Sequence, residues 1–227
     1  MKIGILQTGH APEGMVELQG DYDNMFEKML DGHDFTFQTF SVVDGEFPST
    51  PQDADGWLIT GSKHGAYEDH AWIPPLEDLI RDIHAADKPM IGVCFGHQII
   101  AQAMGGKVVK FEGGWSVGRT EYTIDGKQVA LNAWHQDQVV ELPHGADVLG
   151  HSDFCANAVL AYGDSIWTIQ PHPEFPAASV DVLIRTRGKG VVPDDLLATA
   201  TDRLEQPTHN ADMARHMAQF FKSKARA

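Results

Sequence analysis

A cysteine between two glycines, Gly92-Val-Cys94-Phe-Gly96, is the feature of this sequence best suited to covalent chemistry. The apolar run Met90 to Val93 predicts a strand before it, and Ile99 to Met104 predicts a helix after it. Such a strand–turn–helix elbow lifts a nucleophile above the end of a sheet. The glycines permit a strained turn, and a helix N-terminus favours thiolate over thiol. We therefore predict that Cys94 is a nucleophile and not a small core residue.

The segment Gln-Pro-His-Pro-Glu-Phe, residues 170 to 175, contains the best of the 12 histidines for the base that a thiolate requires. It directly follows the strand-like run Ile166 to Gln170, and open α/β sheets place their sites at strand ends. Glu174 is two residues from His172, so its carboxylate can hydrogen-bond the imidazole and fix its tautomer. We predict that His172 is the base and that Glu174 orients it.

Two backbone amides are candidates for stabilising the oxyanion that attack on a carbonyl creates. The N–H of Phe95 directly follows the nucleophile. Gly61 lies in the loop 60–65, after the third apolar run, and a parallel sheet would bring that loop beside the elbow. A second histidine, in Trp134-His135-Gln136-Asp137, is predicted to belong to a binding loop.

Apolar runs alternate with helical periodicity through the first hundred residues, which predicts a parallel sheet with right-handed crossovers. The expected strands are Lys2 to Gln7, Phe35 to Val43, Asp55 to Thr60 and Met90 to Val93, and the expected helices between them are Met15 to Leu30 and Ile73 to Ala86.

After Gly106 the pattern changes to short strand-like runs, which we expect to form antiparallel edge strands and ribbons of the same sheet. These runs are Val117 to Ile124, Gln128 to Ala133, Val139 to Leu142, Ala158 to Tyr162 and Ile166 to Gln170. Asp125-Gly126 and Gly163-Asp164 are expected hairpin turns. Helical periodicity returns in the last part of the chain and predicts helices at Ala178 to Thr186, Asp194 to Leu204 and Ala211 to Ala225.

Composition limits the functional class. The net charge of −15 argues against a nucleic-acid surface, and no apolar run approaches the length of a membrane helix. With only two cysteines, a disulfide framework is not expected and a reducing cytoplasm is the expected compartment. No H-x-x-x-H, C-x-x-C or H-E-x-x-H spacing and no phosphate-binding glycine loop occurs, so we expect no metal and no cofactor.

Three motifs in this order resemble the class I (triad) glutamine amidotransferase family. They are Gly92-Val-Cys-Phe-Gly-His-Gln98, the glycine loop Ile59-Thr-Gly-Ser62, and Pro171-His-Pro-Glu174. Tyr67-Glu-Asp, Trp72-Ile-Pro and Gly113-Gly-Trp-Ser-Val-Gly118 match as well. Within the family, the chain is similar to free-standing proteins that resemble the amidotransferase domain of GMP synthase. The resemblance covers roughly residues 1 to 185.

The resemblance implies a flavodoxin-like three-layer sandwich over residues 1–185, with residues 186–227 as a helical extension packed on it. It implies a triad of Cys94, His172 and Glu174 that forms a γ-glutamyl thioester and releases ammonia from glutamine. It also implies substrate contacts from Ser62 and Gln98, and from the loop residues Trp134, His135 and Gln136. Many relatives have Gly-Pro where this chain has Ser62-Lys63, and Ser-His-Gly-Asp where it has Trp134-His135-Gln136-Asp137. These differences bear on the substrate and not on the catalytic motifs.

Three functions remain open from the sequence, because no synthetase segment follows Phe175. The first is a glutaminase that passes ammonia to a separate synthetase or other acceptor protein. The second is a stand-alone γ-glutamyl peptidase, because GSKHGAYED and GVCFGHQIIA also resemble plant γ-glutamyl peptidases. The third is a non-catalytic regulatory protein with the same fold. We rank glutamine hydrolysis first. The apolar stripe Met213, Met217, Phe220 and Phe221 is expected either to cover the sheet or to form a homodimer contact.

Overall fold

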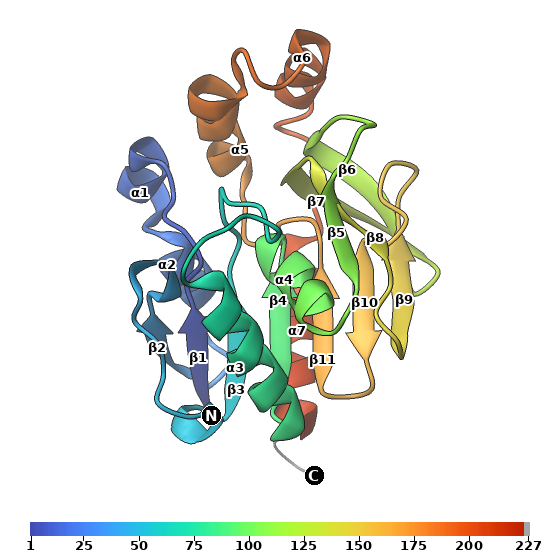
Figure 1. The fold of residues 1–227 in the computed structure, drawn as a ribbon. Coiled ribbons are helices and arrows are strands. Elements are labelled where there is room, and N and C mark those ends of the chain that lie inside the picture. The colour runs from blue at the N-terminus through green and yellow to red at the C-terminus, as the bar shows by residue number, and fades with distance from the viewer. Residues whose placement is uncertain (225–227) are drawn as a thin grey trace.

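The computed structural model describes residues 1–224 and contains a nine-stranded mixed sheet with helices on both faces (Figure 1). The strands are β1 (Lys2–Leu6), β2 (Thr36–Phe40), β3 (Gly56–Ile59), β4 (Met90–Val93), β6 (Ser116–Ile124), β7 (Lys127–His135), β9 (Ala146–His151), β10 (Val159–Tyr162) and β11 (Ile166–Ile169). Their order is β2-β1-β3-β4-β11-β10-β9-β6-β7. Neighbours from β2 to β11 are parallel, and neighbours from β11 to β7 are antiparallel. The prediction of an α/β fold with a parallel centre and antiparallel edge strands is confirmed.

The central strands β3 and β4 are buried along their whole length. Their sequences, Gly-Trp-Leu-Ile and Met-Ile-Gly-Val, lack polar side chains because each strand is covered on both faces. Alternate residues therefore point into different cores. Trp57 and Met90 pack in the core of one face, and Leu58 and Ile91 pack in the core of the other.

Two pairs of helices cover this part of the sheet and complete a three-layer arrangement (Figure 1). One core contains buried residues of α3 (Ile73–Ala85) and α4 (Phe95–Ala103). The opposite core contains residues of α2 (Tyr22–Met29) and α7 (Asn210–Lys224). Met217 and Phe221 of α7 are fully buried in that core. The apolar stripe of α7 thus covers the sheet. The final residue of this predicted helix, Ala225, lies outside the described residues.

The predicted helix Met15 to Leu30 is wrong as a single element, because the chain forms α1 (Glu13–Gln19) and then α2. Gly20 adopts φ 84°, which ends the first helix, and Asp21 caps the second in a capping box with Asn24. Hydrophobic spacing continues across the break, so periodicity alone did not reveal it.

Several further details differ from the prediction. Helix α4 begins at Phe95, four residues before the expected Ile99, so it starts directly after Cys94. The run Val139 to Leu142 was expected in the main sheet, but it lies in β8 (Asp137–Glu141), which forms a separate two-stranded sheet with β5 (Lys107–Lys110). Neither β5 nor β9 was expected. Both are partly exposed strands whose short mixed sequences carry little periodic signal. The expected hairpin turn between β6 and β7 is present, with Asp125 and Gly126 both at positive φ.

The remaining elements lie mainly at the ends of the sheet. Short 3₁₀ turns, η1 (Val42–Asp44) and η2 (Pro51–Asp53), follow β2. Helix α5 (Ala177–Leu183) continues as a π-helical turn, η3 (Ile184–Gly188), and is followed by α6 (Asp194–Asp202). Figure 1 shows α5 and α6 at the top, beyond the carboxyl end of β4. Among residues 1–224, no helix is both long and apolar enough to cross a membrane.

Candidate active site

Cys94 is the single residue between β4 and α4, and its backbone is strained. It adopts φ 53° and ψ −104°, a conformation that non-glycine residues rarely occupy. The flanking glycines make the turn possible. A Cβ added at Gly92 would lie 2.5 Å from the carbonyl oxygen of Gly96, and one at Gly96 would lie 2.3 Å from the carbonyl oxygen of Ile59. Helix and strand therefore pack more closely than any side chain would allow.

Neighbouring strands hold this turn through backbone hydrogen bonds. The Cys94 N–H donates to the carbonyl of Ile169 at 2.9 Å, and the Gly96 N–H donates to that of Thr60 at 3.1 Å. Cys94 is 6% exposed and caps α4, so its sulfur lies at the positive end of the helix dipole.

His172 and Glu174 lie beside the elbow because β11 runs parallel to β4 and ends next to it. Nδ1 of His172 is 2.7 Å from Oε1 of Glu174, and both side chains are buried. The backbone N–H of His172 donates to the carbonyl of Asn132 in β7 at 2.8 Å, and its ring stacks on Phe175 with centroids 3.9 Å apart. The imidazole is thus held by Glu174 and Phe175, and the backbone that carries it is held by β7.

The electrostatics of this pair favour a charged imidazole. Burial alone would lower the pKa of His172, but the negative charges of Glu174 and of Cys94 outweigh it and raise the pKa well above its ordinary value. The second carboxylate oxygen of Glu174 is buried and has no hydrogen-bond partner among residues 1–224. The charge of Glu174 is therefore directed mainly at His172.

Both residues that supply the predicted oxyanion amides lie next to Cys94. Phe95 is the first residue of α4, and the amides of a first helical turn have no partner within the helix. Gly61 packs against the side chains of His172 and Cys94. A Cβ built on Gly61 would lie 3.0 Å from Cε1 of His172 and 3.7 Å from Cβ of Cys94. The β3 loop therefore approaches the elbow as the parallel order predicted. The role of these amides stays a prediction.

A cleft of about 370 Å³ opens beside Cys94 and His172. It is lined by every substrate-side residue predicted from the sequence, namely Ser62, Gln98, Trp134, His135 and Gln136. Within residues 1–224, the lining does not include Glu174, which lies behind His172.

Several of these residues hold the walls of the cleft together. The hydroxyl of Ser62 donates to the Thr8 carbonyl at 2.7 Å. The side-chain amide of Gln98 donates to the Asp137 carbonyl at 3.0 Å. His135 is 4% exposed, and burial lowers its pKa to about 4. A neutral imidazole whose ring nitrogen faces a backbone carbonyl is a poorer candidate base than His172.

Tyr22, Trp115 and Arg187 also line the cleft, although the sequence did not single them out. Tyr22 fits the apolar periodicity of a core helix. Trp115 belongs to the stretch Gly113 to Gly118, which is part of the sequence resemblance but indicates no role for the tryptophan. Arg187 lies in the π-helical turn, which has no sequence signature, and only the tertiary structure brings it here.

Known proteins resemble this chain over most of its length. The model of the family "Glutamine amidotransferase class-I" matches residues 42–182. Gamma-glutamyl peptidase 4 of Arabidopsis thaliana is 32% identical over 204 residues, which cover 82% of this chain and 81% of the relative. A component of the glutamine-hydrolyzing GMP synthase of Halobacterium salinarum is 28% identical over 70% of this chain and 87% of its own.

A solved structure has the same fold. The crystal structure of a glutamine amidotransferase from Methylobacillus flagellatus superposes with a TM-score of 0.77, at 23% identity, over 99% of this chain and 92% of its own. With the family match spanning more than half of the sequence, this chain belongs to the class I glutamine amidotransferase family.

Proposed function

We propose that this protein is a cysteine hydrolase that cleaves γ-glutamyl amide bonds, with γ-glutamyl peptides as its substrate class. The observation that carries the proposal is the similarity to γ-glutamyl peptidase 4, which extends over 82% of this chain at 32% identity. A second peptidase from the same plant, γ-glutamyl peptidase 2, is 28% identical over 90% of this chain. Residues Cys94, His172 and Glu174 supply chemistry suited to such a reaction.

In the first half-reaction, the Cys94 thiolate attacks the γ-carbonyl carbon, and the carbonyl oxygen becomes an oxyanion. The amides of Phe95 and Gly61 are the proposed donors to that oxygen. Collapse of the intermediate breaks the carbon–nitrogen bond, and the imidazolium of His172 gives its proton to the leaving amine. The products are a free amine and a γ-glutamyl thioester on Cys94. The raised pKa of His172 suits this step because the ring must enter it protonated.

In the second half-reaction, water hydrolyses the thioester. His172, now neutral, removes a proton from the water as it attacks the same carbonyl carbon. Breaking the carbon–sulfur bond restores the thiolate and releases a γ-carboxylic acid, which loses its remaining proton to solvent, while His172 keeps the proton taken from the water for the next cycle. Glu174 stabilises the imidazolium at 2.7 Å throughout and does not itself need to be protonated.

The cleft supports a substrate larger than glutamine. It is also lined by the aromatic rings of Trp115 and Trp134, whose centroids are 6.4 Å apart, and by the cationic side chain of Arg187. These groups can contact an amino-acid residue on the amine side of the scissile bond and its carboxylate. A glutamine side chain, whose leaving group is ammonia, has nothing to place there.

Glutamine hydrolysis for a separate synthetase is the second candidate. It is supported by the similarity to the archaeal GMP synthase component, which is lower in identity and covers less of the chain. This order reverses the ranking drawn from the sequence, because the similarity to the peptidases extends over more of the chain.

Steady-state turnover of the isolated protein on glutamine and on a γ-glutamyl dipeptide tests the proposal. We expect a kcat/KM for the dipeptide at least tenfold above that for glutamine. Strong glutamine turnover without dipeptide cleavage would replace the proposal with the ammonia-donor function. A complete lack of turnover on both, with a folded protein, would favour a non-catalytic role.

A further inference from the structure

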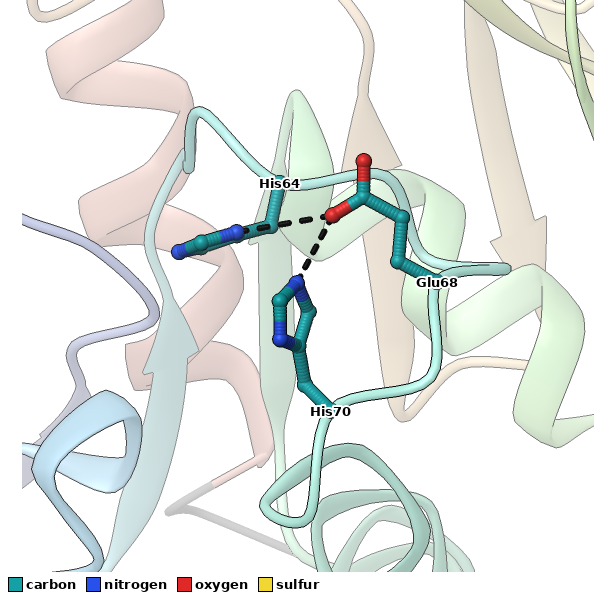
Figure 2. A group of neighbouring side chains, drawn as sticks. All are labelled: His64, Glu68 and His70. Atoms are coloured by element: carbon teal, nitrogen blue, oxygen red, sulfur yellow. Dashed lines mark hydrogen bonds and ion pairs between the residues drawn. The ribbon is translucent and has the colours of Figure 1, made fainter.

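We propose that His64, Glu68 and His70 form a binding site for a divalent transition metal of the zinc class. All three residues lie in the loop between β3 and α3, and Figure 2 shows their side chains converging on one point. One ligand atom from each residue lies within 4.8 Å of the others. The metal-ligand spacings recognisable in sequence do not include this set, whose pattern is H-x-x-x-E-x-H.

The two distances to the Glu68 carboxylate require little movement to accept an ion. Nδ1 of His64 is 3.5 Å from Oε2 of Glu68, as expected for two ligands of one tetrahedral ion with bonds of roughly 2.0–2.2 Å. Nε2 of His70 is 2.7 Å from the same oxygen, which is a hydrogen bond. An ion would replace that hydrogen bond, and the two atoms would separate by roughly 0.7 Å to reach coordination geometry.

The imidazoles are held in place by aromatic packing. His70 stacks on Trp72 with centroids 5.9 Å apart and planes at 11°, and His64 meets the edge of His70 at 4.3 Å. Trp72 is 9% exposed and packs against Phe95 at 5.5 Å, so the loop rests on the first residue of α4. Each ring is therefore oriented before any ion binds, which lowers the entropic cost of assembling a site.

The ligand chemistry selects the class of ion. Two imidazole nitrogens and one carboxylate oxygen suit Zn²⁺, Co²⁺ or Ni²⁺, whereas Mg²⁺ and Ca²⁺ prefer sites made of oxygen alone. Three protein ligands leave one position of a tetrahedral ion for water or another small ligand. Because His64 and Glu68 also line the cleft, a bound ion adds positive charge to one wall of the cleft.

The proposal is tested by metal binding alone, in a protein that cannot turn over substrate. The full chain is prepared metal-free as Cys94→Ala, because a thiolate beside His172 could itself bind metal. Titration with Co²⁺ is followed by visible absorption, and Zn²⁺ is then used to displace the Co²⁺. We expect one Co²⁺ to bind per chain, with an absorption spectrum typical of Co²⁺ at a low coordination number. One equivalent of Zn²⁺ should displace the Co²⁺ fully. A negative result here leaves the proposed hydrolase function untouched.

Three variants in the Cys94→Ala background assign the ligands. His70→Asn and Glu68→Gln should each weaken Co²⁺ binding at least tenfold, while His144→Asn should leave it unchanged, because His144 is an exposed histidine outside the cluster. Circular dichroism checks that each variant is folded. If only one of the two ligand variants folds, its Co²⁺ affinity alone is sufficient for the test. The proposal is overturned if no Co²⁺ binds at millimolar concentration, if both ligand variants bind normally, or if Mg²⁺ displaces Co²⁺ at equal concentration.

Discussion

Nδ1 of His172 lies 2.7 Å from Oε1 of Glu174, and the side chains are only 5% and 0% exposed. Away from water, the carboxylate has no competing solvent and stabilises a proton on the imidazole strongly. The charge of Glu174 therefore sets the pH range in which His172 carries a proton that it can donate.

Glu174→Gln should shift the pH dependence of activity. The substitution keeps the hydrogen-bonding shape but removes the negative charge that raises the pKa of His172, so the pKa falls. His172 then loses its proton at lower pH, and the alkaline limb of the kcat/KM profile should move to lower pH. The change is measured by pH–rate profiles of both proteins on a γ-glutamyl dipeptide. An unmoved alkaline limb would mean that another group controls it.

Cys94→Ala should reduce turnover by on the order of a thousandfold or more, because the thioester cannot form. Cys155→Ser is the matched control. Cys155 is 1% exposed, and burial raises its pKa to about 12, so it cannot supply a thiolate near neutral pH. Turnover of the control should stay within a few-fold of the wild type. Near-normal turnover of Cys94→Ala would eliminate the thioester mechanism.

His172→Ala should be nearly inactive, and His135→Ala should keep substantial turnover with a changed KM. Both imidazoles are buried in or beside the cleft, but only His172 is hydrogen-bonded to a carboxylate. Comparing kcat and KM of the two variants separates the base from a wall residue. An active His172→Ala protein with an inactive His135→Ala protein would show that the base had been assigned to the wrong strand end.

Gly96→Ala should destabilise the fold by about 3 kcal/mol, at the upper end of the usual cost of overpacking. The added methyl group would lie 2.3 Å from the Ile59 carbonyl oxygen, which is backbone and cannot move without displacing β3. Gly14→Ala in α1 is the control, because its methyl group would meet only Val182, at 3.7 Å. This substitution should raise the free energy of unfolding by about 0.5–1 kcal/mol, because alanine favours a helix over glycine. Urea unfolding of both variants measures the difference. Equal stabilities would contradict the close packing of elbow and strand.

Arg187→Ala should raise the KM for a γ-glutamyl dipeptide a few-fold and leave that for glutamine unchanged. The expectation rests on the proposed contact between Arg187 and a carboxylate on the amine side, and its size is modest because the side chain is exposed. Arg185→Ala is a suitable control, since Arg185 is also exposed but pairs with Asp181 and does not line the cleft. A parallel rise in KM for both substrates would place the effect on the shared glutamyl part instead.

Local sequence was sufficient to predict most elements that position the site. Strand β4 has the predicted bounds, Met90–Val93, and β11 differs from its prediction by one residue. Both are short, mostly apolar runs bounded by turn residues, and such runs become buried strands wherever helices cover both faces of a sheet. The glycines around Cys94 likewise indicated a close approach, because no other residue type allows one there.

Positions that depend on distant parts of the chain were not predictable in this way. Arg187 reaches the cleft from a π-helical turn, and the loop holding His64 and His70 folds back on Trp72, so their neighbours are set by packing between elements. The apolar stripe of α7 could have faced a second copy. Its burial against the sheet was decided by the tertiary structure, because hydrophobic spacing specifies that a face must be covered but not what covers it.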